Sequence, residues 1–216
     1  MKQKLMNTYG AIIILFAFMT VACTQVQKPA AEPKPEKPAQ EQQKEIPEKK
    51  PLSGYFPLSQ GNTWQYQGEG NEYASFIREV VFVKGNRAQI KEDNGGTVSA
   101  SVFEVSEQEI TRIFFQGEAY EEKNLLDAEP NDDLVILKAP LQVGTTWETK
   151  DGTREIVDIN ATVDTPAGRF DQVLKVKISH PDSTMYEYFK EGIGMVKKEF
   201  ISGETKVTSS LEKYQK

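Results

Sequence analysis

The chain has 216 residues, of which 27% are charged, and a formal net charge of −6 at pH 7. This acidic balance argues against nucleic-acid binding, which requires a cationic surface. Cys23 is the only cysteine, so a disulfide within the chain is excluded and a hydrophobic core must stabilise the fold. Aromatic residues make up 10% of the chain, which is enough for such a core.

The first 22 residues have the composition of a secretory signal peptide. Lys2 and Lys4 precede an apolar stretch at residues 11–19, and small residues lead to Cys23. The apolar stretch is well short of the ~20 residues that a membrane-spanning helix needs, which disfavours the alternative of an uncleaved membrane helix. Removal of residues 1–22 takes away both lysines and changes the formal net charge from −6 to −8.

The sequence Thr20-Val21-Ala22-Cys23 resembles the lipobox of bacterial lipoproteins. In that family, the cysteine becomes the first residue of the mature chain and carries diacylglycerol on its sulfur. The resemblance therefore implies that Cys23 is the lipid attachment site and that the mature protein is anchored at the extracytoplasmic face of a bacterial membrane. Two acyl chains on one residue supply the paired anchor that stable membrane binding requires.

Residues 23–53 form a predicted tether that is rich in proline, lysine, glutamate and glutamine. We expect disorder, because such a segment buries too little apolar surface to offset its chain entropy. Its prolines favour an extended polyproline conformation. They are Pro29, Pro33, Pro35, Pro38, Pro47 and Pro51. Two roles stay open, a spacer that holds the domain away from the membrane and a linker without a length requirement.

The folded domain is predicted to span residues 54–216 and to contain two related halves, residues 54–138 and 139–216. The pattern P-L-x-x-G-x-T-W occurs at residues 57–64 and again at residues 140–147. This spacing is too long for the common solenoid repeats, so a single domain built from two halves is the simpler account.

Each of these motifs is predicted to form a turn that leads into a strand, because proline fixes φ and glycine permits positive φ. A basic–acidic–aliphatic sequence follows each tryptophan, at residues 78–81 and 154–157. We expect Trp64 and Trp147 to pack in the core at the end of the sheet, since burial is commoner than ligand stacking for a large aromatic side chain.

Most of the domain shows the alternation and the turn residues of β-strands. One strand is predicted to begin at Trp64 and another at Trp147. The other predicted strands cover residues 75–83, 88–90, 97–105, 109–116, 154–163, 170–179, 185–189, 194–201 and 206–211. The expected fold class is all-β, an antiparallel sandwich or open barrel of about ten strands. Residues 118–126 are the one stretch with room for one or two helical turns.

A second resemblance covers much of residues 140–216. It consists of a T-P-A-G-x-F turn at residues 165–170, an aromatic strand at residues 186–189 and a G-x-G-x-V-K strand start at residues 192–197. These motifs are similar to a pattern in uncharacterised bacterial envelope proteins. The resemblance implies a β fold and carries no established activity, so it assigns no functional residue.

Candidate catalytic, cofactor and metal-binding features are weak, and the sequence predicts none of these sites. His180 is the only histidine and lies in a predicted turn. Gly192-Ile193-Gly194 lacks the third glycine of a dinucleotide-binding loop. The acidic residues at 127–133 are weighed as calcium ligands, but a solvated linker is favoured because no glycine marks the turn of a calcium loop.

Three functions are compatible with these features. The favoured one is a non-enzymatic binding or structural lipoprotein of the cell envelope, with an envelope protein or polymer as its partner. The alternative is a carrier of a lipid or other apolar ligand, which predicts a sizeable apolar cavity between the sheet faces. The least favoured is a hydrolase that uses two carboxylates in one cleft, with Glu107, Glu109, Glu121 and Glu122 as the available acids.

Overall fold

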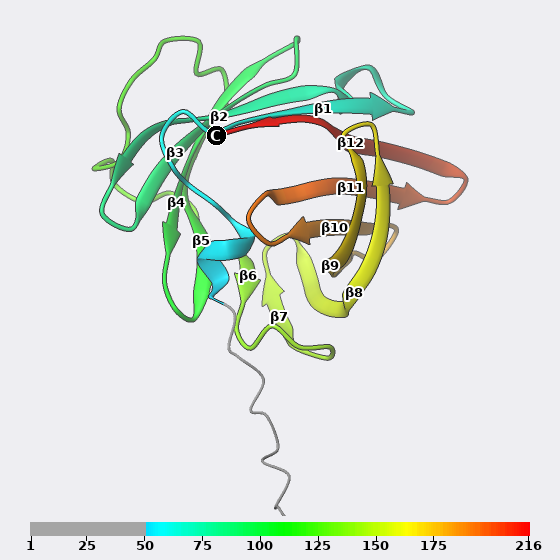
Figure 1. Ribbon diagram of the computed structural model, residues 1–216. Helices are drawn as coiled ribbons and strands as arrows, with labels where there is room; N and C mark the ends of the chain where they lie inside the picture. Colours follow the sequence, from blue (N-terminus) through cyan, green and yellow to red (C-terminus); the bar gives the residue numbers. More distant parts are fainter. Residues whose placement is uncertain (1–50) are drawn as a thin grey trace, which may run out of the picture. The chain divides into compact units, whose positions relative to one another are not determined.

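The computed structural model describes residues 51–216. The predicted signal peptide, the proposed lipidation site Cys23 and residues 23–50 of the predicted tether lie outside the described residues. The described part folds into twelve strands and two short 3-10 helices (Figure 1). Their bounds are η1 (Leu52–Tyr55), β1 (Thr63–Glu69), η2 (Glu72–Ala74), β2 (Phe76–Lys84), β3 (Arg87–Asp93), β4 (Val98–Val105), β5 (Glu109–Gln116), β6 (Leu134–Lys138), β7 (Thr146–Thr149), β8 (Gly152–Thr165), β9 (Gly168–Ser179), β10 (Thr184–Lys190), β11 (Gly194–Ser202) and β12 (Thr205–Gln215).

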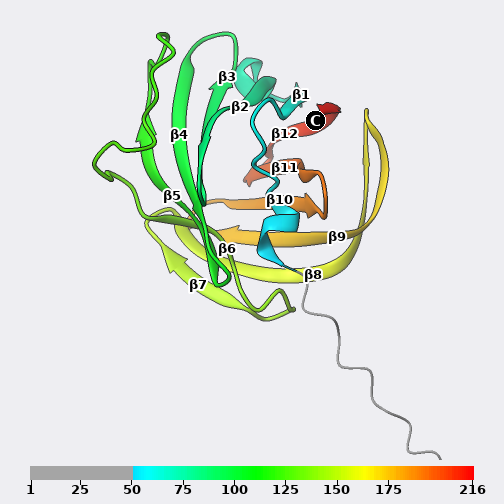
Figure 2. The same cartoon turned by 60° about the vertical axis from the view of Figure 1, so that its left-hand side comes forward.

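All twelve strands belong to one antiparallel sheet in the order β6-β5-β4-β3-β2-β1-β12-β11-β10-β9-β8-β7. Strands that follow one another in sequence are paired, except β6 and β7. β1 pairs with β12, whereas β6 and β7 form the two edges of the sheet. The sheet curls into a nearly closed, barrel-like form (Figures 1 and 2). The predicted all-β fold is therefore confirmed, in its open-barrel rather than its sandwich version.

The strand predictions are mostly confirmed, with two differences. The turn predicted at Gly85-Asn86 joins β2 to β3, and β5 covers the residues predicted for it. β6 was not predicted from the sequence. The helical turns expected at residues 118–126 are wrong, because this segment has no helix and instead runs as an irregular connection between β5 and β6.

Side chains from all twelve strands and from η1 form one hydrophobic core cluster on the inner side of the sheet. The burial follows the strand period: Trp64 and Tyr66 are 4% and 2% exposed, whereas Gln65 between them is exposed. Trp147 is 6% exposed. Both tryptophans are thus core residues, as the sequence predicts.

The folded part begins earlier than the boundary predicted at residue 54. Leu52 is 3% exposed and belongs to the core, although the sequence assigns it to the tether. The phenyl ring of Phe56 lies 5.0 Å from that of Phe103, and the carbonyl of Gly54 accepts a 2.7 Å hydrogen bond from the amide of Gly192. These contacts hold η1 inside the curve of the sheet (Figure 2).

A second, smaller hydrophobic cluster lies on the outer side of the sheet. Ala100 and Val102 of β4 pack there against Leu125 and Leu126 from the β5–β6 connection. Gln89, which is 3% exposed, binds the same connection through both ends of its amide group. A side chain of β3 therefore fixes a segment that has no regular secondary structure of its own.

The two P-L-x-x-G-x-T-W motifs make matching backbone hydrogen bonds. The amide of Gly61 donates to the carbonyl of Val80, and the amide of Gly144 donates to the carbonyl of Ile156, each at 2.9 Å. Across the sheet, the strands of the first half lie in the order β6 to β1 and those of the second half in the order β12 to β7, so both halves are arranged in the same way. The duplication stays a prediction, and these shared contacts support it.

Candidate functional site

A pocket with a volume of about 990 Å³ lies beside η1 at one end of the barrel-like sheet. Four separate segments line it. They are residues 51–55 around η1, residues 105–107 at the β4–β5 turn, residues 139–142 after β6, and part of the β8–β9 hairpin. A volume of this size falls within the ~300–1,000 Å³ range of small-molecule binding sites.

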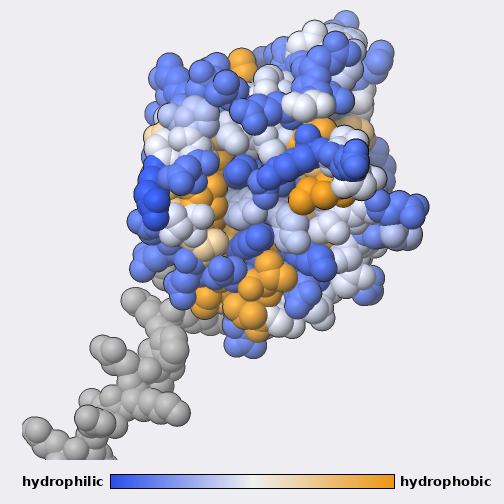
Figure 3. Space-filling model, turned by 90° about the vertical axis from the view of Figure 1, so that its right-hand side faces the viewer, coloured by the Kyte–Doolittle hydropathy of each residue, from blue (hydrophilic) through white to orange (hydrophobic). Residues whose placement is uncertain are grey.

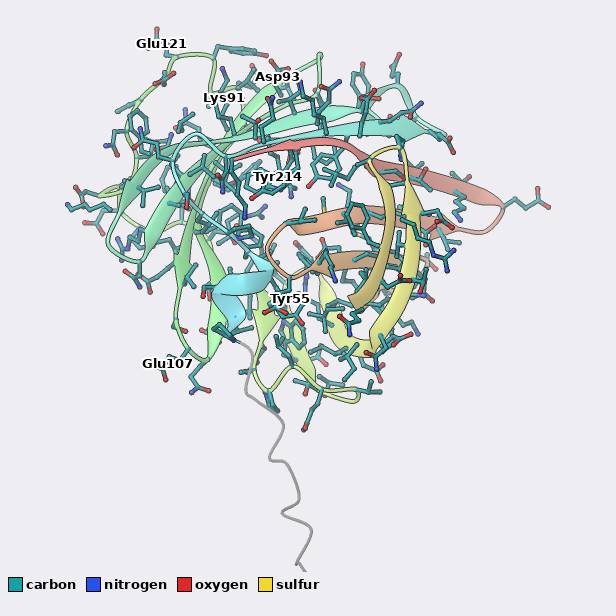
Figure 4. The ribbon with its side chains drawn as sticks, viewed as in Figure 1. Tyr55, Lys91, Asp93, Glu107, Glu121 and Tyr214 are labelled. Atoms are coloured by element: carbon teal, nitrogen blue, oxygen red, sulfur yellow. The ribbon has the colours of Figure 1, made fainter. Side chains whose placement is uncertain are left out.

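Apolar side chains form most of the pocket wall, including Leu52, Leu141, Ile159 and Leu174. Glu107 is the one charged residue in the lining, and Figure 4 shows it at the margin of the domain, away from Tyr55 in its middle. The remaining polar side chains are those of Tyr55 and of serine, asparagine and glutamine residues. The pocket therefore suits an apolar group, with neutral hydrogen-bonding groups beside it.

Irregularities in the β8–β9 hairpin shape the wall of the pocket. The pairing register shifts between Asp158 and Ala161, so that Ile159 and Asn160 both line the pocket although they are consecutive residues. In a regular strand, consecutive side chains point to opposite faces, and a bulge removes this restriction. The carboxylate of Asp158 accepts a 2.8 Å hydrogen bond from the amide of Asn160, which stabilises the bulged segment.

Gln172, on the opposite strand of the hairpin, has a φ of 54° and also lines the pocket. A positive φ is unfavourable for a residue with a side chain, and such backbone strain is commonly found at functional sites. Within the described residues only Glu118 shares this conformation among the residues other than glycine. The strained position thus coincides with the pocket wall.

The interior next to Trp64 is filled by side chains. The space bounded by Trp64, Tyr66, Arg78 and Met195 holds only about 20 Å³. The sequence-based alternative of a carrier, which requires a large cavity between the sheet faces, is therefore not supported for this part of the interior. The open pocket beside η1 is the place where an apolar ligand would fit.

Within residues 51–216, the carboxylates that the sequence offers to a hydrolase do not converge in one cleft. Glu107 and the pair Glu121-Glu122 are exposed, and the half-buried Glu109 accepts a weak 3.4 Å hydrogen bond from Thr111. These acids, which the sequence offers to a hydrolase, are not brought together by the fold. The buried carboxylates of the described residues are instead engaged by cations.

Glu92 and Asp132 are two of the carboxylates that have a lowered pKa. Burial alone raises the pKa of Glu92, but Arg78 and Lys198 outweigh burial and hold the pKa below its usual range. For Asp132, burial is likewise outweighed, here by hydrogen bonds from Lys150 and Arg112. Neither carboxylate has the raised pKa that a general acid requires.

The weaker sequence candidates lie in turns and connections. His180 lies in the turn between β9 and β10, and its amide donates a 2.9 Å hydrogen bond to the carbonyl of Ser183. In the acidic segment, Asp127 pairs with Lys84 at 2.7 Å. Among residues 51–216, no group of three or more His, Cys, Asp or Glu side chains is arranged to hold a metal ion.

The outer surface carries mixed polarity. Figure 3 shows hydrophilic residues separating small hydrophobic areas on one face of the domain. Ile159 of the pocket is 39% exposed, and Val143 in the adjoining β6–β7 loop is 59% exposed. No helix within residues 51–216 is both long enough and apolar enough to cross a membrane.

Comparison with known proteins yields no family. No family model matches the sequence, and no curated protein matches it. Two solved structures are similar to this chain. One is a presumed exported protein with a YMCC-like fold from Bacteroides fragilis, at 17% identity over 75% of this chain and 99% of that one, with a TM-score of 0.47. The other is a presumed lipoprotein from Parabacteroides distasonis, at 16% identity over 74% of this chain and 98% of that one, with a TM-score of 0.39.

The pocket was not predicted from the sequence. Its lining residues come from four segments that are far apart in the chain, and none carries a recognisable motif. The one local signal is the poor alternation of β8 around Ile159 and Asn160, which is compatible with a bulge. The predicted attachment site Cys23 lies outside the described residues.

Proposed function

We propose that this protein is a non-enzymatic binding module, anchored by lipid on Cys23 at the extracytoplasmic face of a bacterial membrane. In this proposal, the pocket beside η1 binds an apolar chain or ring of a small ligand. The lipobox-like sequence and the signal-like N-terminus support the anchor.

The pocket is the observation that carries the binding role. It combines a volume of about 990 Å³ with a wall made mainly of apolar side chains. An apolar ligand that enters it would remove apolar surface from water at a gain of roughly 25 cal/mol per Å². This favours the apolar-ligand alternative over a purely structural role.

The polarity of the wall limits the ligand class. Among residues 51–216, no cationic side chain lines the pocket, and Glu107 is the only charged residue in its wall. An anionic headgroup placed there would lack a counter-charge and would be repelled by this carboxylate. We therefore expect an uncharged apolar group, such as an alkyl or acyl chain, to be bound in the pocket.

The anchor is tested separately from the pocket. Metabolic labelling with a radioactive fatty acid is expected to label the wild-type protein and not the Cys23→Ser variant. The same substitution should move the protein from the membrane fraction to the soluble fraction. An unlabelled wild-type protein, or a variant that stays with the membrane, would refute lipid anchoring without affecting the pocket.

The binding role is tested by native mass spectrometry of the Cys23→Ser protein purified from cells. The expected result is an additional mass that corresponds to an apolar ligand and disappears after delipidation. A spectrum that contains only the unliganded chain, both before and after addition of monoacylglycerol, would contradict the binding role.

A further inference from the structure

Five charged side chains face the core side of the sheet in a region that shares no residue with the end pocket. The pairing of the strands fixes their orientation, because residues that lie opposite each other point to the same face of the sheet. Arg78 lies opposite the buried Trp64, and Glu187 lies between Val176 and Lys198 of the neighbouring strands. The five residues, named here the interior charge cluster, are Arg78, Glu92, Arg154, Glu187 and Lys198.

Four of these residues form two ion pairs. The Nε atom of Arg78 lies 2.5 Å from a carboxylate oxygen of Glu92, and Nη1 of Arg154 lies 2.9 Å from a carboxylate oxygen of Glu187. The side chains of Arg154 and Glu187 are 4% and 13% exposed, whereas those of Arg78 and Glu92 are 22% and 32% exposed. The cluster thus runs from a buried pair to a pair that solvent reaches.

Lys198 is the fifth member and has no carboxylate of its own. Within the described part of the chain, no carboxylate oxygen lies within 4.0 Å of its Nζ atom. Its neighbour Glu187 is engaged by Arg154, and its ammonium lies 5.2 Å from the ring centroid of Phe76. Burial and the charge of Arg78 lower the pKa of Lys198.

The cluster therefore holds three cations and two carboxylates, which leaves an excess of one positive charge. A second donor also lacks an acceptor, because Nε of the buried Arg154 has no hydrogen-bond partner among residues 51–216. Lys198 is half-buried, whereas Arg154 is 3% exposed, and an unsatisfied donor is costly in a buried environment. A bound anion would offset the excess positive charge of the cluster.

We propose that the interior charge cluster is a binding site for a phosphate group, free or esterified. Lys198 would supply the main charge, and Arg154 and Arg78 would donate hydrogen bonds to the phosphate oxygens. Guanidinium and ammonium groups are the common partners of phosphate in proteins. The ligand would reach the site from the more exposed Arg78–Glu92 side.

The test is a ³¹P NMR titration of the purified full-length protein with inorganic phosphate and with glycerol 3-phosphate, at constant ionic strength in chloride. The wild-type protein should broaden the signal of at least one of the two compounds with saturation. Saturation by both indicates free phosphate as the ligand, and saturation by the ester alone indicates an esterified one. No saturable broadening by either compound up to about 20 mM would overturn the proposal.

Two variants make the result specific. Lys198→Gln should weaken binding by about tenfold or more, and Lys198→Met provides the same readout if the first variant does not fold. Lys213→Gln, which removes an exposed lysine from β12, should bind like the wild type. Equal affinity of the Lys198 variants and the wild type would also overturn the proposal. Neither outcome bears on the end pocket, since none of the five residues lines it.

Discussion

Trp64 and Trp147 occupy corresponding positions in the two halves of the sheet. Each is the second residue of its strand, and each indole N–H donates a hydrogen bond to a backbone carbonyl, at 2.6 Å to Ile193 and at 3.0 Å to Val135. The surroundings differ, however, because β1 pairs with β12 whereas β7 has no ladder to β6. Trp147 therefore bridges the open seam of the sheet.

This difference predicts unequal effects of Trp→Phe substitution. Each variant loses a buried hydrogen bond and some core volume, so each should lower the free energy of unfolding by about 2 kcal/mol in urea titrations. Only Trp147→Phe should also speed amide hydrogen exchange in β6. The exposed Val143→Ala is the control, with an expected change below about 0.5 kcal/mol. Equal exchange of β6 in the two Trp variants would contradict a bridging role.

The amide of Gln89 is predicted to hold the β5–β6 connection in place. Its Nε2 donates to the carbonyl of Lys123 at 2.8 Å, and its Oε1 accepts from the amide of Leu125 at 2.7 Å. Gln89→Leu removes both bonds and leaves two backbone groups without partners, which should cost about 2 kcal/mol. Limited proteolysis should then cut within residues 117–133 faster than in the wild type. An unchanged cleavage rate would show that the apolar contacts alone hold this segment.

Gly70 and Gly203 offer a matched pair of glycine substitutions. Both have positive φ, 83° and 54°, but a Cβ on Gly70 would overlap the carbonyl of Lys206, whereas a Cβ on Gly203 meets no atom within 4 Å. Gly203→Ala should cost about 1 kcal/mol from backbone strain, and Gly70→Ala at least about 3 kcal/mol. The free energies of unfolding measure both. Similar costs for the two variants would contradict the close approach at Gly70.

Glu199 gives the stability a defined pH dependence. Burial alone raises its pKa, but the hydroxyl of Tyr188, at 2.6 Å, and the ammonium groups of Lys206 and Lys197 outweigh burial and lower the pKa to about 2. Because the folded-state pKa lies below the reference value of 4.5, this stabilisation is complete above about pH 4.5 and is lost as the pH falls towards 2.

Glu199→Gln should therefore lower the free energy of unfolding by about 1 to 2 kcal/mol at pH 7, discounted for the exposure of the lysine partners. The difference between wild type and variant should shrink as the pH falls from 4.5 towards 2. Urea titrations at several pH values measure it. A difference that stays constant down to pH 2 would contradict the assignment to Glu199.

Local signals in the sequence predicted most of the strands. Turn residues such as Gly85-Asn86 and the alternation within β5 depend on neighbouring residues only, and the structure has these elements as predicted. β6 escaped prediction because Leu134–Lys138 is a short, nearly continuous apolar run, which has no period to recognise. The prediction of helical turns at residues 118–126 failed for a different reason. The side chain of Gln89, from a strand distant in the sequence, forms hydrogen bonds with the backbone of this segment.

The candidate site could not be predicted in the same way. The pocket depends on a bulge at Ile159-Asn160, on a strained backbone at Gln172 and on η1, which the sequence assigns in part to the tether. The interior charge cluster depends on strand register, which decides that Lys198 faces the core side rather than solvent. Both features arise from contacts between distant segments.

The binding role of the pocket is tested most directly with an uncharged apolar probe. The Cys23→Ser protein would be titrated with N-phenyl-1-naphthylamine, whose fluorescence rises in apolar surroundings. The proposal predicts saturable binding that Ile159→Asp weakens by about tenfold or more, while Ile77→Asp, at a site that is 51% exposed and outside the pocket, leaves it unchanged. Non-saturable fluorescence, or the same affinity in the Ile159→Asp variant and the wild type, would contradict the assignment of the pocket as a binding site.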